Sequence, residues 1–198
     1  MEHFNVTISR QFGSLGRPIG MKLAEILGVE FYDRDIVEEA ARQLNLPLSE
    51  ASNLEEKEKT GFLYMRYPLG GNSLEIKERL YEIQNRIITD WAAKKSCVMV
   101  GRCSDYILRN EKNHMNFFIF APYEERLKNC IEDLNMSKSE AIKMIQEVDK
   151  ARNAYHKRYT RFLPKDLEYN HVMIDSSVLG VDGTAEIMAE IVKKNFGL

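Results

Sequence analysis

The chain has few cysteines, and none of them falls in a pattern that pairs thiols or binds a metal. Among its 198 residues there are three, Cys97, Cys103 and Cys130, without a Cys-x-x-Cys pair or a histidine at ligand spacing. Zinc sites and disulfide frameworks both need such patterns. We expect Cys97, which opens an apolar strand, to be a core residue. Cys103 lies beside a candidate site, and this position is the one reason to consider it as a reactive thiol.

The chain also lacks a strong charge of either sign and a long apolar run. Its net charge is −2, so no overall field draws it to nucleic acid or to an anionic membrane, and any basic site must be local. No apolar run approaches the roughly 20 residues that span a membrane. The first residues lead into a strand without a basic-then-apolar leader. We expect a cytoplasmic protein that binds neither nucleic acid nor membrane.

Strand-like and helical segments alternate along the chain, and the 44% apolar content suffices for an ordinary core. This alternation is typical of a parallel sheet covered on both faces, and the length suits one α/β domain. The expected strands are 4–9, 29–32, 97–100, 116–120 and 171–174. The expected helices are 15–27, 35–44, 73–94, 123–134, 137–159 and 183–194, with a short exposed helix over 49–59 and a loop over 61–71.

The helix over 73–94 carries apolar residues at helical spacing, from Leu74 to Trp91. Such a stripe is typical of a face packed on the core. If it extends beyond what the sheet covers, it would instead serve as the surface of a homodimer. Both interpretations stay open.

The most informative segment is the strand, glycine turn and helix between Phe4 and Gly20. Glycines let backbone N–H groups converge, and a helix N-terminus adds partial positive charge, so this order builds a phosphate cradle. A complete phosphate loop ends in Gly-Lys-Ser/Thr. This chain has Gly16, Arg17 and Pro18 there and lacks both the lysine and the hydroxyl. Similar turns also occur for purely structural reasons.

Polar residues follow each of the first three expected strands. Gly13–Arg17 follows the first, Asp33 follows the second, and Gly101 with Arg102 follows the third. In an open parallel sheet, ligands lie beyond the carboxyl ends of the strands. If the connections are right-handed, these residues meet at one edge and form an anion site.

Three of these polar residues each have two interpretations. Arg102 presents a five-donor fork suited to a phosphate, or it is a surface arginine at a strand end. Asp105 accepts hydrogen bonds from a base or sugar, or it is a charge at a helix N-terminus. Asp33 is a helix cap, or it is a carboxylate that orients an acceptor or holds magnesium-bound water.

The segment 147–161 is the most basic part of the chain, and Arg152, Tyr155 and Tyr159 share one helical face in it. A charge run is usually a solvated face. A basic face that closes over polyphosphate is also what phosphoryl transfer needs. No nucleophile–base pair favours hydrolysis.

Together these segments resemble the cytidylate kinase-like family of P-loop proteins, within the nucleoside monophosphate kinase fold. The resemblance rests on residues 8–17, 31–35, 100–105 (Val-Gly-Arg-Cys-Ser-Asp), 120–126, 149–159 and 174–177. It implies a three-layer, five-stranded parallel sheet of P-loop kinase topology, with helical acceptor-binding and lid regions. The sheet core would comprise 1–33, 96–135 and 165–198, the acceptor lobe 34–95 and the lid 136–164.

The resemblance also implies roles for individual residues. The donor phosphates of ATP, with Mg²⁺, would bind at Gly13, Ser14, Leu15, Gly16 and Arg17, and the donor adenine would lie near Asp175. Asp33, Arg102 and Asp105 would bind the acceptor, and Arg17, Asp33, Arg152 and Arg158 would act in catalysis. Arg17 lies one residue later than the family's lysine, Pro18 offers no hydroxyl, and Ser14 would reach Mg²⁺ only through water. No residue is assigned as a direct metal ligand.

These residues predict a kinase that moves the γ-phosphoryl group of ATP to a nucleoside monophosphate or a related small phosphate-bearing acceptor. Loss of both the lysine and the hydroxyl also suits a protein that binds a nucleotide or phosphate without kinase activity. A third hypothesis keeps the enzyme but gives it an acceptor that is not a nucleotide, because residues 64–71 form an unusual aromatic and basic loop.

Overall fold

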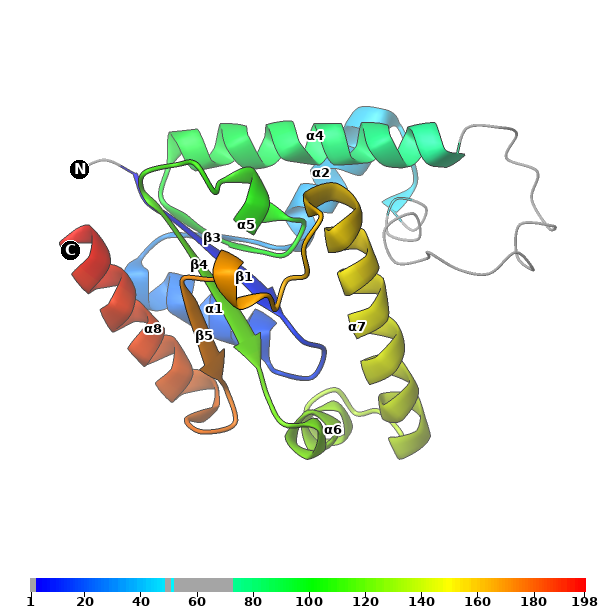
Figure 1. Cartoon of the computed structure of the whole chain (residues 1–198), viewed down its shortest axis with the longest axis vertical. Coiled ribbons are helices and arrows are strands. Elements are labelled where there is room, and N and C mark those ends of the chain that lie inside the picture. The colour runs from blue at the N-terminus through cyan, green and yellow to red at the C-terminus, as the bar shows by residue number, and fades with distance from the viewer. Residues whose placement is uncertain (1–2, 49–50, 52–72) are drawn as a thin grey trace.

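A computed structural model describes residues 3–48, 51 and 73–198. Its core is a parallel sheet of five strands in the order β2-β3-β1-β4-β5 (Figure 1). The expected parallel α/β fold is thus confirmed. Most of the expected helix over 49–59 and all of the expected loop over 61–71 lie outside the described residues.

The described elements follow the predicted order. The strands are β1 (Asn5–Arg10), β2 (Glu30–Tyr32), β3 (Cys97–Val100), β4 (His114–Phe120) and β5 (Val172–Asp175). The helices are α1 (Gly16–Leu27), α2 (Arg34–Leu44), α4 (Ser73–Lys94), α5 (Ser104–Ile107), α6 (Tyr123–Glu132), α7 (Lys138–Thr160) and α8 (Gly180–Phe196), with a 3-10 turn at Leu167–Tyr169. The short helix α5 was not expected, because it is only one turn long.

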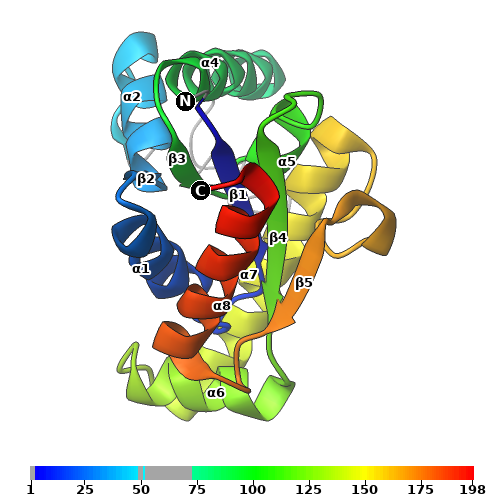
Figure 2. The ribbon, with the colours of Figure 1, turned by 90° about the vertical axis from the view of Figure 1, so that its left-hand side faces the viewer.

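Helices cover both faces of the sheet. Helices α1 and α8 pack side by side on one face, and α7 runs along the opposite side (Figures 1 and 2). Side chains alternate across a strand. In β3, accordingly, Val98 and Val100 join the core under α1 and α8, whereas Cys97 and Met99 join the core under α2 and α4.

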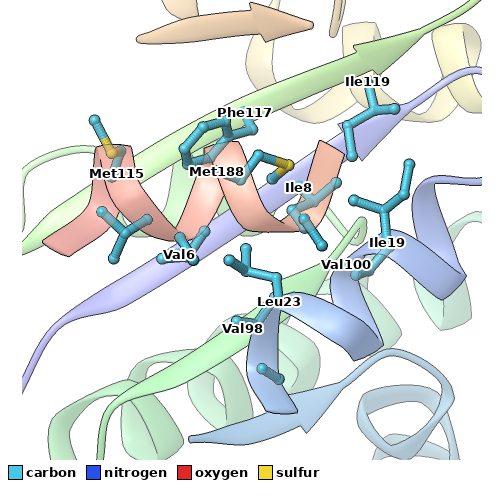
Figure 3. Close-up of a cluster of buried hydrophobic side chains, with 14 of the residues drawn as sticks. Val6, Ile8, Ile19, Leu23, Val98, Val100, Met115, Phe117, Ile119 and Met188 are labelled. Atoms are coloured by element: carbon cyan, nitrogen blue, oxygen red, sulfur yellow. The ribbon is translucent and has the colours of Figure 1, made fainter. Parts of the chain in front are cut away.

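The first core lies between the sheet and helices α1 and α8 (Figure 3). Ile8 of β1 and Phe117 of β4 are fully buried, and they meet Ile19 and Leu23 of α1 and Met188 of α8. This packing holds the start of α1 against the end of β1. It therefore determines where the loop between them lies.

The second core contains much of the apolar stripe of α4. Leu80, Ile87 and Ile88 are buried against α2 and β3 in this core, and Trp91 packs against it. At these residues, the apolar stripe of α4 therefore packs on the core of the same chain. A homodimer stays an untested prediction. Cys97, Cys103 and Cys130 are all buried, and none of them forms a disulfide within the described residues.

None of the described helices is both long enough and apolar enough to cross a membrane.

The packing of α1 on the sheet can be tested at Leu23, which is 0% exposed. We expect Leu23→Ala to lower the free energy of unfolding by about 2–5 kcal/mol, because it leaves a cavity between α1 and α8. Met21 in the same helix is 46% exposed and serves as the matched control. Met21→Ala should change the free energy of unfolding by no more than about 0.5 kcal/mol in the same urea titration. Equal losses in the two variants would contradict this account of the core.

Candidate phosphate-binding site

The sheet order brings the first three strand ends together. Strand β3 lies between β1 and β2, and all three run parallel. The loop after β1, Asp33 after β2 and the Gly101-Arg102 segment after β3 therefore lie at the same edge. This convergence is what the sequence predicted.

The loop between β1 and α1 has the backbone of an anion cradle. Gly13 and Leu15 are left-handed, with φ of 77° and 57°, and α1 begins at Gly16. Within the described part of the chain, the N–H groups of the five residues 13–17 donate to no protein acceptor. Consecutive free N–H groups at a helix N-terminus bind anions, because their dipoles converge.

Neighbouring side chains hold the loop by its carbonyl groups. Asn129 Nδ2 donates to Gly13 O at 2.9 Å, and Ser176 Oγ donates to Ser14 O at 2.8 Å. These bonds use carbonyl acceptors of the loop, so the N–H donors of residues 13–17 remain available to a ligand. Gly13 must lack a side chain here, since a Cβ would lie 2.7 Å from Arg126 O.

The loop fits phosphate better than it fits a protein-held magnesium ion. Ser14 is fully buried, and its Oγ lies 3.0 Å from Gln11 O and 3.2 Å from Ile119 O, to which it donates. Pro18 has no hydroxyl, and the described residues contain no group of three His, Cys, Asp or Glu side chains that would hold a metal. An Mg²⁺ that arrives with ATP would be held by phosphate oxygens and water.

Asp33 is a carboxylate that lies against two arginines beside the loop. Its Oδ2 accepts a hydrogen bond from Arg17 Nε at 2.8 Å, and its Oδ1 lies 3.8 Å from Arg10 Nη2. Asp33 stands at the N-cap position of α2, but its side chain makes no capping hydrogen bond. The carboxylate is therefore directed to the arginines and does not cap the helix.

Sequence analysis did not identify Arg10 as a site residue. Its side chain is 16% exposed. Burial and the charge of Arg152 lower the pKa of Arg10 well below its usual value; Asp33 opposes this shift, and Arg102 and Arg17 add to it. The charges of three other guanidinium groups and of one carboxylate thus act on Arg10. The signal in the sequence was an arginine that ends a strand of otherwise buried residues, since arginine is seldom buried without a partner.

The segment after β3 has an uncommon backbone. Gly101, Arg102 and Cys103 all have positive φ, at 80°, 58° and 55°. Two consecutive non-glycine residues in this region cost free energy, and such conformations cluster at functional sites. This turn keeps Arg102 close enough to Arg10 for their charges to interact.

Asp105, expected to bind the acceptor, is 6% exposed and contacts α7 instead. Its Oδ2 lies 2.8 Å from His156 Nε2, while His156 Nδ1 lies 3.0 Å from Phe162 O. Both ring nitrogens face acceptors, so the arrangement favours the doubly protonated ring. Burial opposes this charge and is the largest single cause, but the hydrogen bond and charge of Asp105, the Phe162 carbonyl and the charge of Asp166 together raise the pKa of His156. Acceptor binding by Asp105 stays a prediction.

The basic residues of α7 separate into two sets. Arg152 Nη1 donates to Arg10 O at 3.3 Å and thus lies with the loop. Arg158 instead contacts Glu78 of α4 at 2.7 Å, on the same side as Tyr159, whose ring stacks on Tyr81 at 3.9 Å. The structure therefore brings only Arg152 of the two predicted arginines to the cluster.

Asp149 joins α7 to the loop, a contact that sequence analysis did not assign. Its Oδ1 accepts the Phe12 N–H at 2.7 Å, and its Oδ2 pairs with Arg126 Nη1 at 2.6 Å. The Phe12 N–H is therefore already hydrogen-bonded within the described part of the chain, in contrast to the N–H groups of residues 13–17.

Asp175 is the last residue of β5, and its side chain forms hydrogen bonds with a residue two positions later in the chain. Its Oδ1 accepts hydrogen bonds from the Ser177 N–H at 2.9 Å and from Ser177 Oγ at 2.7 Å. The predicted contact with the donor base stays a prediction.

The fold has counterparts among solved structures. An uncharacterized protein from Eubacterium ventriosum aligns with a TM-score of 0.74 and 21% identity, over 96% of this chain and 99% of that one. A shikimate kinase from Acinetobacter baumannii, solved with shikimate, aligns with a TM-score of 0.54 and 14% identity, over 98% of this chain and 94% of that one. A comparison with curated proteins finds no significant match.

The sheet order and the loop after β1 define a P-loop kinase fold, and these neighbours share it. The cytidylate kinase-like family matches residues 5–178. The chain belongs to that family, and the predicted resemblance is confirmed.

The His156–Asp105 contact predicts a pH dependence of stability. Because the folded-state pKa of His156 is raised above its ordinary value of 6.5, the stabilisation is complete below that value and is lost as pH rises through the raised pKa. The difference in free energy of unfolding between wild type and His156→Gln should therefore be constant well below pH 6.5 and shrink as pH rises above 6.5. The exposed His3 is the control, and His3→Gln should show no such trend. A difference that grows with pH would contradict the contact.

Proposed function

We propose that the chain is an ATP-dependent phosphotransferase whose acceptor is a nucleoside monophosphate or a related small phosphate-bearing molecule. The observation that carries the proposal is the row of five N–H groups at residues 13–17, which donate to no acceptor in the described part of the chain and lie beside the arginine cluster around Arg10. Phosphoryl transfer depends on positioning and charge neutralisation, and this combination supplies both.

The donor phosphates would bind the loop from Gly13 to Arg17. The acceptor phosphate would lie toward Arg102, because that residue follows β3 at the same edge of the sheet. Arg17 of α1 and Arg152 of α7 both lie close enough to Arg10 for their charges to act on it, and there they would neutralise the charge of the transferred group. Asp33 would keep Arg17 oriented through their 2.8 Å hydrogen bond.

We further propose that residues 34–95 form the acceptor region and 136–164 the lid. Support comes from α7, which contacts the loop through Asp149 and Arg152. A lid that closes in this way excludes water, so that transfer to the acceptor is favoured over hydrolysis of ATP.

A phosphate- or nucleotide-binding protein without kinase activity is the second candidate. Ser14 and Pro18 favour it, because the hydroxyl of Ser14 donates to buried carbonyls and Pro18 has none. Such a protein would keep the anion cradle and lose the hydroxyl that usually holds the metal.

The two candidates differ in turnover. We expect ADP release from Mg-ATP to depend on one member of a panel of CMP, dCMP, UMP, AMP and shikimate, with a matching phosphorylated product. Shikimate is included because a neighbour of the same fold is a shikimate kinase. ATP binding without acceptor-dependent ADP release across the panel would favour the binding protein.

Arg17 provides a test of the catalytic step. With the acceptor identified, Arg17→Ala should lower kcat about 100-fold, because the transition state loses a charged donor. Arg42 lies on α2, is exposed and pairs with Glu39 at 2.6 Å, so Arg42→Ala is the matched control and should keep the wild-type kcat. Full turnover in Arg17→Ala would exclude Arg17 from this step.

A further inference from the structure

We propose that Arg10 takes the place of the missing phosphate-loop lysine, so that the terminal phosphates of the donor are bound by a side chain from the end of β1. The proposal deepens the proposed function and rests on its donor site. It assigns the phosphate cation to a residue that precedes the loop, whereas in the general pattern the cation follows it.

The resemblance places the family's lysine one residue before Arg17, and this chain has Gly16 at that position. Gly16 is the first residue of α1, and its φ is not left-handed, so the backbone does not require glycine there. The requirement is space, because a Cβ on Gly16 would lie 2.7 Å from Arg10 Cβ and 2.9 Å from Arg10 Cγ. The stem of Arg10 therefore fills the space in which a lysine stem at residue 16 would begin.

Gly101 makes space for the other end of the same side chain. A Cβ on Gly101 would collide with Arg10 Nη1, and Arg10 Nη2 lies 3.8 Å from Asp33 Oδ1. The guanidinium group thus reaches from the donor loop to the ends of β3 and β2, where the acceptor residues are expected. Phosphoryl transfer concentrates negative charge between the donor and the acceptor. The Arg10 guanidinium would lie at that position.

The charge around Arg10 fits a polyphosphate. Arg17, Arg102 and Arg152 are close enough for their charges to act on Arg10, and the charge of Asp33 opposes their effect on it. Like charges at this density repel one another, so the cluster favours a ligand with several negative charges. A guanidinium also binds two phosphate oxygens at once, which an ammonium does not.

The test measures binding of inorganic triphosphate by calorimetry at fixed ionic strength. We expect Arg10→Gln to weaken binding at least about tenfold, as loss of a charge-assisted hydrogen bond does. Arg10→Gly/Gly16→Lys moves the cation to the position that the general pattern gives it, and binding should recover to within a few-fold of wild type. Thermal unfolding without ligand verifies that each variant folds.

Two controls separate local binding from overall charge. Arg42→Gln removes an exposed arginine elsewhere and should bind as wild type does. Arg10→Gly/Ile187→Lys restores the net charge on the exposed face of α8, where Ile187 is 45% exposed, and should stay weak.

The outcomes distinguish this proposal from the proposed function. Wild-type triphosphate binding in folded Arg10→Gln, or no recovery in folded Arg10→Gly/Gly16→Lys, overturns the role of Arg10 and leaves kinase activity open to the acceptor assay. Loss and recovery of binding in a protein that turns over no acceptor supports Arg10 and counts against the kinase.

Discussion

The arrangement of the site depends on one carboxylate that holds two guanidinium groups where three strands end. Asp33 binds Arg17 at 2.8 Å and lies 3.8 Å from Arg10, and it does so from the end of β2. Without a negative charge at this point, the arginines around Arg10 would repel one another. Asp33 therefore offsets part of the positive charge around Arg10, beside loop N–H groups that donate to no acceptor among the described residues.

Helix α7 is the second element on which the site depends. Along its length it contacts the loop through Asp149, the Arg10 carbonyl through Arg152 and α5 through His156. Its tyrosines then join it to α4, where Tyr155 donates to Gln84 Oε1 at 2.8 Å. The proposed lid is thus connected by a single helix to both the loop after β1 and the proposed acceptor region.

Much of the fold follows from local patterns. The strands and helices lie close to their predicted ranges, because periodicity and glycine stops are properties of short segments. The boundaries differ where tertiary pairing extends an element, as in β4, which begins at His114 because it pairs with Asn5 of β1. The strand ends that hold Asp33 and Gly101 were also predictable, because parallel strands place their carboxyl ends at one edge.

The partners of the charged side chains were not predictable in the same way. The sequence assigned Asp105 to an acceptor and Arg158 to a phosphate, yet Asp105 lies against His156 and Arg158 against Glu78. These partners are 51 and 80 residues away in the chain, and no spacing within a helix encodes them.

By itself, the sequence determined that the chain is an α/β protein of the cytidylate kinase-like family, with a glycine loop that lacks the usual lysine and hydroxyl. Only the tertiary structure decided which cation stands beside that loop. Arg10 reaches the site because Gly16 and Gly101, from two separate segments, both leave room for its side chain. Such a fit arises from packing in three dimensions, which neither composition nor local spacing records.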